Sequence, residues 1–176
     1  MRSLRALLLL PATGLLAGCG IGPAGPDRIE GTAPAVTVAP SVYWVTPDGK
    51  LRGVAPQGKQ PATPLITESL VKQLLRGPSE VLTLENLASK LPAIPEDKDF
   101  AVTVTTPAPG TVTVALPHDV SRLGRTAVGQ IVCTVWSAEA ARRGRLDQVE
   151  VILTGSSRRS GPYRCADFPA VAGPSA

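Results

Sequence analysis

The chain has 176 residues, 43% of them hydrophobic, and its 18 basic and 14 acidic side chains give a formal net charge of +4. This length suits one domain with flanking segments and is sufficient to bury a hydrophobic core. With 3% aromatic residues and a single histidine, the composition argues against base stacking on nucleic acid and against a histidine-based metal site.

The N-terminus is typical of a secretory signal. Arg2 and Arg5 precede an apolar run over residues 6–16, and small residues follow it up to Cys19. This order of basic, apolar and small residues defines a signal peptide. The run is too short for a transmembrane helix, which needs about 20 apolar residues. An ordinary secretory signal with an incidental cysteine is the other alternative.

The Leu-Ala-Gly-Cys sequence that ends at Cys19 resembles the lipobox of bacterial lipoproteins. In that class a diacylglycerol is joined to the cysteine sulfur and the chain is cut before it. The resemblance implies that residues 1–18 are a signal peptide and that Cys19 becomes the acylated N-terminus. Two acyl chains make such anchoring stable, since each buried CH₂ adds about 0.8 kcal/mol. We therefore expect a cell-membrane protein on the extracytoplasmic face, with membrane lipid as the partner of Cys19.

Residues 19–40 are rich in Gly, Pro and Ala and predict a flexible tether. The folded domain is expected over residues 41–169, followed by a disordered tail over 170–176. Its first expected feature is a hairpin. Residues 42–46 are dense in β-branched and aromatic side chains, residues 47–50 carry a turn signal, and residues 51–55 predict a shorter partner strand.

Two helices are expected further along. The first opens at Thr63, which can cap it, with Pro64 in its first turn, and it ends at Gly77 and Pro78. Residues 80–91 are compatible with a short helical turn or with irregular chain. The second helix is expected over residues 124–141, because apolar side chains recur there on one face.

Three more strands are expected. Residues 99–105 and 111–116 alternate in polarity and predict a second hairpin, joined by a turn over residues 107–110. Residues 148–154 predict the last strand. The order ββαββαβ favours an α+β fold, a two-layer sandwich in which two helices cover one face of a mostly antiparallel sheet.

Two cysteines remain once Cys19 carries lipid. In an exported domain, Cys133 and Cys165 predict a disulfide. The closed loop runs from residue 133 to residue 165, for which the chain-entropy model gives about 3.5–4 kcal/mol of stabilisation. A redox-active pair is the alternative, but it lacks the Cys-x-x-Cys spacing.

Arginine is concentrated in the C-terminal third, where residues 120–165 contain eight arginines against three acidic residues. Anionic lipid, an anionic wall polymer or an acidic protein face could bind such a surface. The other reading is a solvated basic face with no partner. The candidate binding patch consists of Arg142, Arg143, Arg145, Arg158 and Arg159.

The sequence offers little for catalysis. His118 and Asp119 are neighbours and could form part of an acid–base site, yet no Gly-x-Ser-x-Gly nucleophile motif accompanies them. A polar turn after a strand is the simpler reading, whereas an enzyme would need both side chains in a cleft. No ligand spacing for a metal and no phosphate-binding glycine loop is present. We therefore assign no catalytic residue, metal or cofactor.

Several local patterns together resemble the GerMN domain of spore germination and sporulation proteins. The most specific are the Leu-Leu-x-Gly-Pro motif at residues 74–78 and the Gln-x-x-x-Thr motif of Gln130 and Thr134. The resemblance implies an αββαβ core akin to ring-building motifs, an extracytoplasmic lipoprotein and no established catalytic site. Residues 117–119 depart from the family pattern. The Ala-, Arg-, Pro- and Gly-rich composition further indicates an actinobacterial source.

These observations predict a lipid-anchored, non-catalytic binding or assembly module of the bacterial envelope, which presents a sandwich face or an edge strand to an envelope protein. An accessory regulator of an envelope sensor kinase or of cell-wall synthesis is the alternative, and an envelope hydrolase is a weaker one. Ring assembly does not follow from the resemblance, because a shared fold does not carry a shared function.

Overall fold

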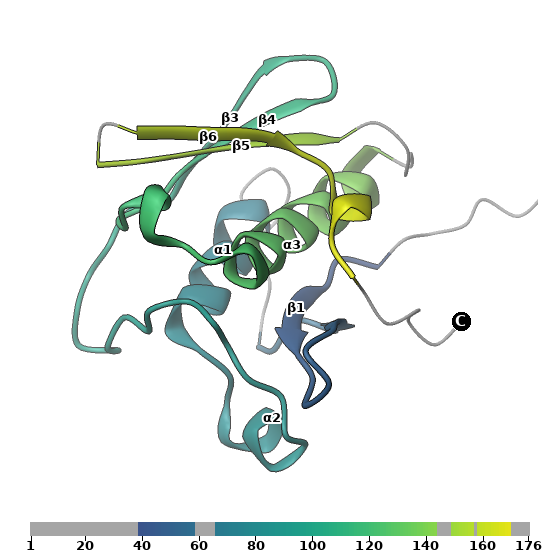
Figure 1. Cartoon of the computed structure of the whole chain (residues 1–176), viewed down its shortest axis with the longest axis vertical. Helices are drawn as coiled ribbons and strands as arrows, with labels where there is room; N and C mark the ends of the chain where they lie inside the picture. Colours follow the sequence, from purple (N-terminus) through teal and green to yellow (C-terminus); the bar gives the residue numbers. More distant parts are fainter. Residues whose placement is uncertain (1–38, 59–65, 144–148, 157, 170–176) are drawn as a thin grey trace, which may run out of the picture. The chain divides into compact units, whose positions relative to one another are not determined.

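The computed structural model describes residues 39–58, 66–143, 149–156 and 158–169 (Figure 1). Cys19, the expected signal peptide, nearly all of the expected tether and the expected tail lie outside these residues. The elements in chain order are β1 (Val42–Val45), β2 (Leu51–Val54), α1 (Ile66–Arg76), α2 (Glu80–Leu84), β3 (Thr103–Ala108), β4 (Thr111–Ala115), the 3₁₀ turn η1 (Val120–Arg122), α3 (Arg125–Arg143), β5 (Glu150–Gly155), β6 (Arg158–Tyr163) and the 3₁₀ turn η2 (Cys165–Asp167). This mixture confirms the predicted α+β class.

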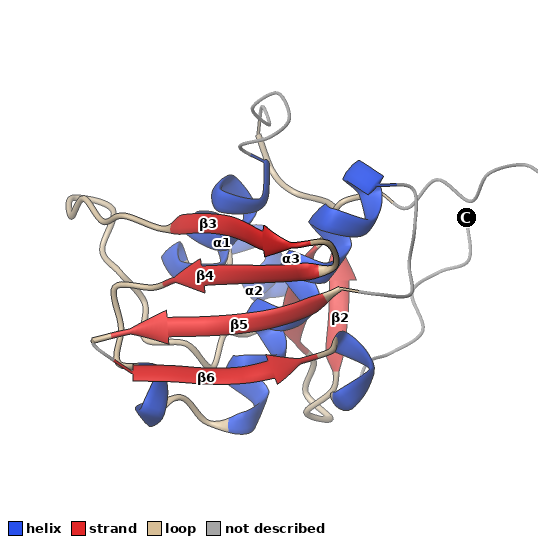
Figure 2. Ribbon diagram, turned by 90° about the horizontal axis from the view of Figure 1, so that it is seen from above, coloured by secondary structure: helices blue, strands red, loops and turns tan. Residues whose placement is uncertain are grey.

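The main sheet has four strands in the order β3-β4-β5-β6. Its outer pairs, β3–β4 and β5–β6, are antiparallel, while β4 and β5 are parallel. The parallel pair is possible because α3 provides the long crossover that such a pair requires. Figure 2 shows the four strands in front with the helices behind them, so helices cover a single face of the sheet.

The predicted N-terminal hairpin is present, but it forms a sheet of its own. β1 pairs with β2 from Val42 opposite Val54 to Val45 opposite Leu51, and neither strand joins the main sheet. Gly49 has a φ of +79° in the connecting turn, a conformation that glycine adopts without steric cost. The single sheet of the predicted sandwich is therefore corrected to two sheets.

Helix α3 lies at the centre of the fold, in contact with α1, the β1–β2 hairpin, β5 and η2. Every residue from Ala127 to Val135 is buried, so the helix has no exposed face over this stretch. The sequence predicted one apolar face. The structure buries the helix all round because elements pack on several of its sides. Its polar side chains must therefore find partners inside the protein.

The hydrophobic core lies between the inner face of the main sheet and the helices. Apolar side chains of β4 and β5 pack there with those of α1 and α3. Fully buried members of this core are Leu70, Leu74, Val112, Val114, Ile131, Val135, Val151 and Leu153. Trp44 of β1 is 1% exposed and belongs to the same core.

Three elements, β6, β3 and α2, go beyond what the sequence predicts. β6 was not predicted, because its Arg-Arg-Ser-Gly-Pro-Tyr sequence carries charges and a proline, which suit only an edge strand. β3 runs on to Ala108 through Pro107, which sequence analysis placed in the turn; a register shift after Thr105 accommodates the extra residues. Part of the ambiguous 80–91 stretch is helical, as α2, with Ser79 as its N-cap.

The first long helix ends as predicted at Gly77, whose φ is +95° and whose N–H donates to the carbonyl of Leu74. Its predicted start, Thr63 and Pro64, lies outside the described residues. No helix of the described ranges is long and apolar enough to span a bilayer.

Candidate functional surfaces

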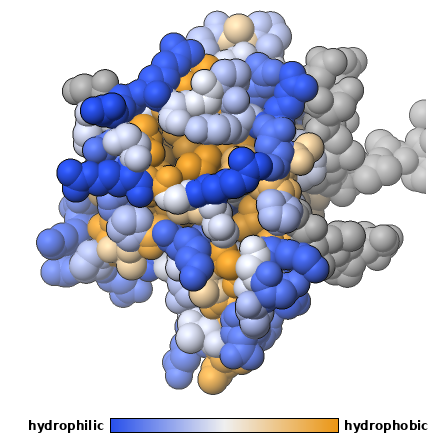
Figure 3. Space-filling model, viewed as in Figure 1, coloured by the Kyte–Doolittle hydropathy of each residue, from blue (hydrophilic) through white to orange (hydrophobic). Residues whose placement is uncertain are grey.

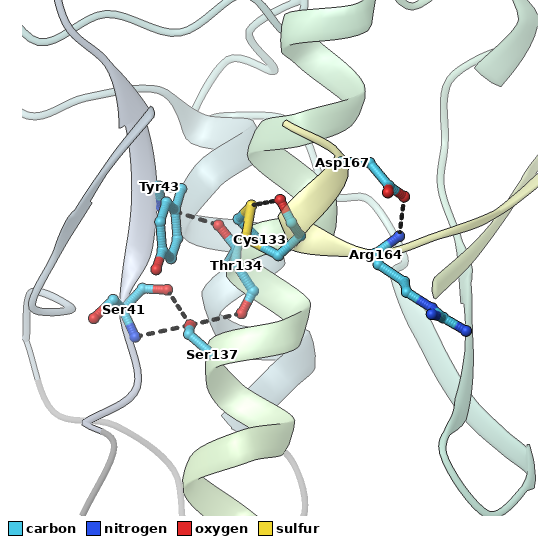
Figure 4. Close-up of a disulfide and its surroundings, with 8 residues drawn as sticks. Ser41, Tyr43, Cys133, Thr134, Ser137, Arg164 and Asp167 are labelled. Carbon is cyan, nitrogen blue, oxygen red and sulfur yellow. Dashed lines mark hydrogen bonds between the residues drawn. A yellow bond between two sulfur atoms is a disulfide. The ribbon is translucent and has the colours of Figure 1, made fainter. Parts of the chain in front are cut away.

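A row of polar side chains on α3 holds strand β1. Gln130 and Thr134 both reach Tyr43: the amide of Gln130 donates to the Tyr43 carbonyl at 3.1 Å, and the Thr134 hydroxyl accepts from the Tyr43 N–H at 3.0 Å. One turn further, the Ser137 hydroxyl bonds the backbone of Ser41 at 2.7 Å and 3.0 Å. Figure 4 shows the Thr134 and Ser137 side chains pointing from α3 towards this strand.

This row explains the Gln-x-x-x-Thr motif. Spacings of four and three residues place Gln130, Thr134 and Ser137 on one side of the helix. The backbone edge of β1 that faces away from β2 would be unpaired, and a buried unpaired backbone group is costly. The side-chain oxygen of Gln130, Oε1, also accepts from the backbone N–H of Lys90 at 2.7 Å. The motif therefore has a structural role, which joins three distant segments.

The predicted disulfide is present and fastens the C-terminal segment to α3. Cys133 and Cys165 are bonded, with their Cα atoms 4.7 Å apart (Figure 4). Phe168 then packs against α3, and the Pro169 carbonyl accepts from the Leu51 N–H at 3.0 Å. The segment after β6 is thus attached to both the central helix and the N-terminal hairpin.

The structure distributes the predicted basic patch over two places. Arg142 and Arg143 contact the buried carboxylate of Glu139 at the end of α3, at 2.5 Å and 3.1 Å. Arg158 and Arg159 lie on β6 opposite Gly155 and Thr154, at the far end of β5. Arg145 lies outside the described residues. The four described arginines therefore do not form one continuous patch.

Glu139 is an ionic centre inside the protein. Its second oxygen accepts from the Thr67 hydroxyl of α1 at 2.9 Å. Burial by itself raises the pKa of Glu139, but hydrogen bonds from Arg142 and Thr67 and the two arginine charges outweigh it and hold the pKa below its ordinary value. Two of the five arginines of the candidate patch are thus engaged in this cluster.

His118 and Asp119 lie together in a surface pocket of about 310 Å³, with Lys90 and Arg122 on its walls. Both side chains therefore line a cleft, which is the arrangement that an acid–base enzyme would require. The two side chains are not hydrogen-bonded to each other, however. Asp119 accepts from the N–H and hydroxyl of Ser121 at 3.0 Å and 2.7 Å, and its other oxygen lies 3.5 Å from Arg122. Among the described residues, no serine, threonine or cysteine lines the pocket.

We call the face of the main sheet that no helix covers the outer face. The strand register places seven uncharged side chains on it, opposite to the buried valines and leucines of β4 and β5. These are Thr103, Thr105, Thr111, Thr113, Ala115, Ile152 and Thr154. The same register also places two charged residues on this face, Glu150 opposite Thr111 and Arg159 opposite Thr154. The alternation of polar and apolar side chains predicts these strands, but nothing in the sequence singles out this threonine surface.

Both edges of the main sheet are blocked to a further strand. On β3, the Val104 N–H already donates to the Glu68 carboxylate at 3.1 Å, and Pro107 has no N–H. On β6, Pro162 likewise has no N–H, and Arg158 and Arg159 add charge. Proline and charge on edge strands discourage strand addition. The outer face is therefore more accessible to a partner than either edge.

A smaller apolar surface lies on α2. Val81 and Leu84 are 61% and 77% exposed, and Figure 3 shows apolar surface at the lower end of that view, where α2 lies. Within the described ranges, no cluster of three or more His, Cys, Asp or Glu side chains has metal-site geometry.

Comparison with known proteins gives one positive result. The family model "Germane: Sporulation and spore germination" matches residues 41–155, which cover every element from β1 to β5. Searches of curated proteins and of solved structures gave no match. Since the match spans well over half of the chain, the protein belongs to the Germane (GerMN) family of sporulation and spore germination domains.

Proposed function

We propose that this GerMN protein is a lipid-anchored, non-catalytic binding module on the extracytoplasmic face of a bacterial membrane, which presents the outer face of its main sheet to an envelope protein. The observation that carries the proposal is the four-stranded sheet with helices on one face only. Its other face is rich in threonine across β3 and β4, and its charged side chains, Glu150 and Arg159, lie on β5 and β6. A scaffold of this kind offers a flat surface with hydroxyl groups for hydrogen bonds and methyl groups for apolar contact.

The chemistry of the outer face limits the kind of partner. Thr103 and Thr105 on β3 are exposed, Thr113 on β4 is half-buried, and Ile152, opposite Thr113 on β5, is 5% exposed. A surface without charge at its centre does not attract a strongly acidic or basic partner over distance. We infer a partner with a neutral, shape-complementary face, whose binding depends on contact more than on ionic strength.

The lipid anchor is supported by the Leu-Ala-Gly-Cys sequence that ends at Cys19. Cys19→Ala should release the protein from the membrane fraction, because the acylated thiol is lost. Thr13→Ala, in the apolar run of the signal, is the matched control and should remain in the membrane. If Cys19→Ala stays in the membrane fraction and is washed out only by detergent, the anchor assignment is wrong.

A non-catalytic role is supported by the state of the His118 pocket. Asp119 is bound by Ser121 and Arg122 and does not orient the imidazole, as an acid–base pair would require. The two residues on which the hydrolase alternative depends thus lie in one pocket, but they are not hydrogen-bonded to each other, and no serine, threonine or cysteine of the described residues lines the pocket beside them.

Site-specific crosslinking tests the binding face directly. A photo-crosslinking amino acid at Thr105 should capture a single envelope protein in intact cells, whereas the same amino acid at Lys72, exposed on α1, should not. Capture of a sensor kinase or a wall-synthesis enzyme would select the regulatory version of the proposal. Equal capture from both positions, or from neither, would contradict the outer face as the binding surface.

A further inference from the structure

We propose that the His118 pocket binds a phosphate group, either of a small soluble phosphate compound or of a phospholipid head group. This inference does not depend on the outer face or on the lipid anchor. The pocket lies where the turn η1 meets the first residues of α3, and its walls include Lys90, His118, Asp119, Arg122, Leu123 and Gly124. Its volume of about 310 Å³ is at the lower end of the range for ligand pockets.

The cations around the pocket exceed what Asp119 neutralises. Lys90 has no carboxylate within 4.0 Å among the described residues, so its ammonium group is available to a ligand. Arg122 is 86% exposed and is shared with Asp119 at 3.5 Å. The charge of Arg158 on β6 also acts on Asp119. Three basic side chains therefore face one carboxylate, and the electrostatic potential at the pocket is positive.

Asp119 is also held in a way that reduces its repulsion of an anion. The Ser121 N–H and hydroxyl both donate to one of its oxygens, and the charges of Arg122 and Arg158 further lower the pKa of this carboxyl group. The carboxylate therefore belongs to the wall, as the N-cap of η1, and fixes Arg122 beside the pocket. Phosphate is favoured over a carboxylate ligand because it accepts from several donors at once.

His118 has a ring nitrogen that no described residue pairs. Its Nε2 is buried and has no hydrogen-bond partner within the described ranges. A buried polar atom of this kind costs free energy unless it is paired. With its proton on Nε2 and its ring turned into the pocket, the imidazole would donate to a phosphate oxygen. The turn that carries His118 packs closely against β5, because a Cβ at Gly155 would lie 2.0 Å from the His118 carbonyl oxygen.

The start of α3 adds to the same field. Gly124 lines the pocket, and its carbonyl accepts the helical bond from the Val128 N–H at 3.0 Å. The first turn of this 19-residue helix has no acidic side chain, so its amide groups and dipole stay favourable to an anion. Pro92 and Leu123 provide an apolar wall for a short substituent on the phosphate.

Calorimetric titration of the full chain with inorganic phosphate tests the proposal. Lys90→Ala, Arg122→Ala and His118→Leu should each weaken phosphate binding about tenfold, since each removes a charged or buried donor. His118→Gln, which keeps a donor, should bind within threefold of the unaltered chain. Lys72→Ala removes the same charge as Lys90→Ala from the surface of α1 and should leave the affinity unchanged. Because Lys90 and Arg122 are exposed, these variants stay folded even if His118→Leu does not.

A vesicle arm distinguishes the two sources of phosphate. The Cys19→Ala chain is mixed with phosphatidylglycerol vesicles and with phosphatidylcholine vesicles. If the protein is retained on phosphatidylglycerol vesicles and Lys90→Ala abolishes that retention, the ligand is the lipid head group. If the pocket binds inorganic phosphate but the protein is not retained on the vesicles, the ligand is a soluble phosphate compound. Absence of phosphate binding at 50 mM, chosen as about fiftyfold above a 1 mM dissociation constant, would overturn the proposal. Binding that Lys72→Ala weakens as much as Lys90→Ala would overturn it as well.

Discussion

Glu139 shows how a single residue can be both buried and charged. It is 3% exposed, and its carboxylate receives hydrogen bonds from Thr67, Arg142 and Arg143. A buried charge is tolerated when its oxygens are paired in this way. The cluster ties α1 to the end of α3, and the partial exposure of both arginines limits its contribution to stability.

Replacing this carboxylate should have a pH-dependent effect. Glu139→Gln is expected to lower the free energy of unfolding by about 2 kcal/mol at pH 7, because the charged acceptor is lost. The pKa of Glu139 is lowered in the folded state. Its stabilisation is therefore present above the ordinary value of about 4.3 and is lost as the pH falls through the folded value.

Urea denaturation at pH 7 and pH 3 measures this difference. The gap between Glu139→Gln and the unaltered chain should be smaller at pH 3 than at pH 7, because protonation of Glu139 removes the charged acceptor as the pH falls towards its lowered folded pKa. Glu96→Gln, an exposed acid without an ion pair among the described residues, is the control and should show no gap at either pH. A gap of equal size at both pH values would show that packing, and not charge, decides the effect.

Gly129 is a second residue where two effects compete. In a helix interior, alanine is favoured over glycine by about 1 kcal/mol. A Cβ at Gly129 would lie 2.7 Å from Cδ1 of Phe168 and 3.0 Å from Cδ1 of Leu51, so the C-terminal segment or the hairpin would have to move. Overpacking of this kind costs about 1–3 kcal/mol. We expect Gly129→Ala to lower the melting temperature.

The background variant Phe168→Ala separates the two effects at Gly129. Without the ring, most of the clash is absent and the helical preference should dominate. Gly129→Ala should then be neutral or stabilising, as measured by thermal denaturation of all four chains of the cycle. The same penalty in both backgrounds would mean that Phe168 is not the obstacle.

At the scale of elements, α3 is attached to β1 by hydrogen bonds from side chains that the sequence reveals as a motif but without their partners. The apolar spacing of α3 predicts the helix, and the hairpin signal predicts β1. Gln130 and Thr134 contact a strand about 90 residues earlier in the chain, and such a pairing leaves no local pattern. For the same reason the sequence identified His118 and Asp119 as neighbours but did not bring Lys90 to them.

Thr134→Val tests this attachment with little change in volume. The valine keeps the shape but leaves the buried Tyr43 N–H without an acceptor, which should cost about 1–3 kcal/mol. Hydrogen exchange of the Tyr43 amide should become faster in the variant. Thr126→Val, in the first turn of the same helix and without a side-chain hydrogen bond, should change stability by less than about 0.5 kcal/mol. Equal losses in both variants would assign the effect to helix propensity instead.

At the scale of the whole molecule, the fold continues beyond the segment that the family model matches. The match ends at residue 155, and residues 158–169 then add the edge strand β6, the disulfide and Phe168. The sequence predicted the disulfide from its cysteine count and the export signal, but it could not predict the polar edge strand between β5 and Cys165. The covalent bond compensates for a segment with few apolar residues.

The disulfide should therefore stabilise the entire domain and not only its C-terminal end. It restricts the unfolded chain through a loop of 32 residues in sequence separation, for which the chain-entropy model gives about 3.5–4 kcal/mol. Cys165→Ala should reduce the free energy of unfolding by about this amount in urea. A reducing agent should shift the unaltered chain to the same midpoint and leave Cys165→Ala where it is. If reduction instead released only residues 158–169 to proteolysis, with an unchanged urea midpoint, the segment would be a local attachment, and the hydrogen bond from Leu51 to Pro169 would have no part in the cooperative unit.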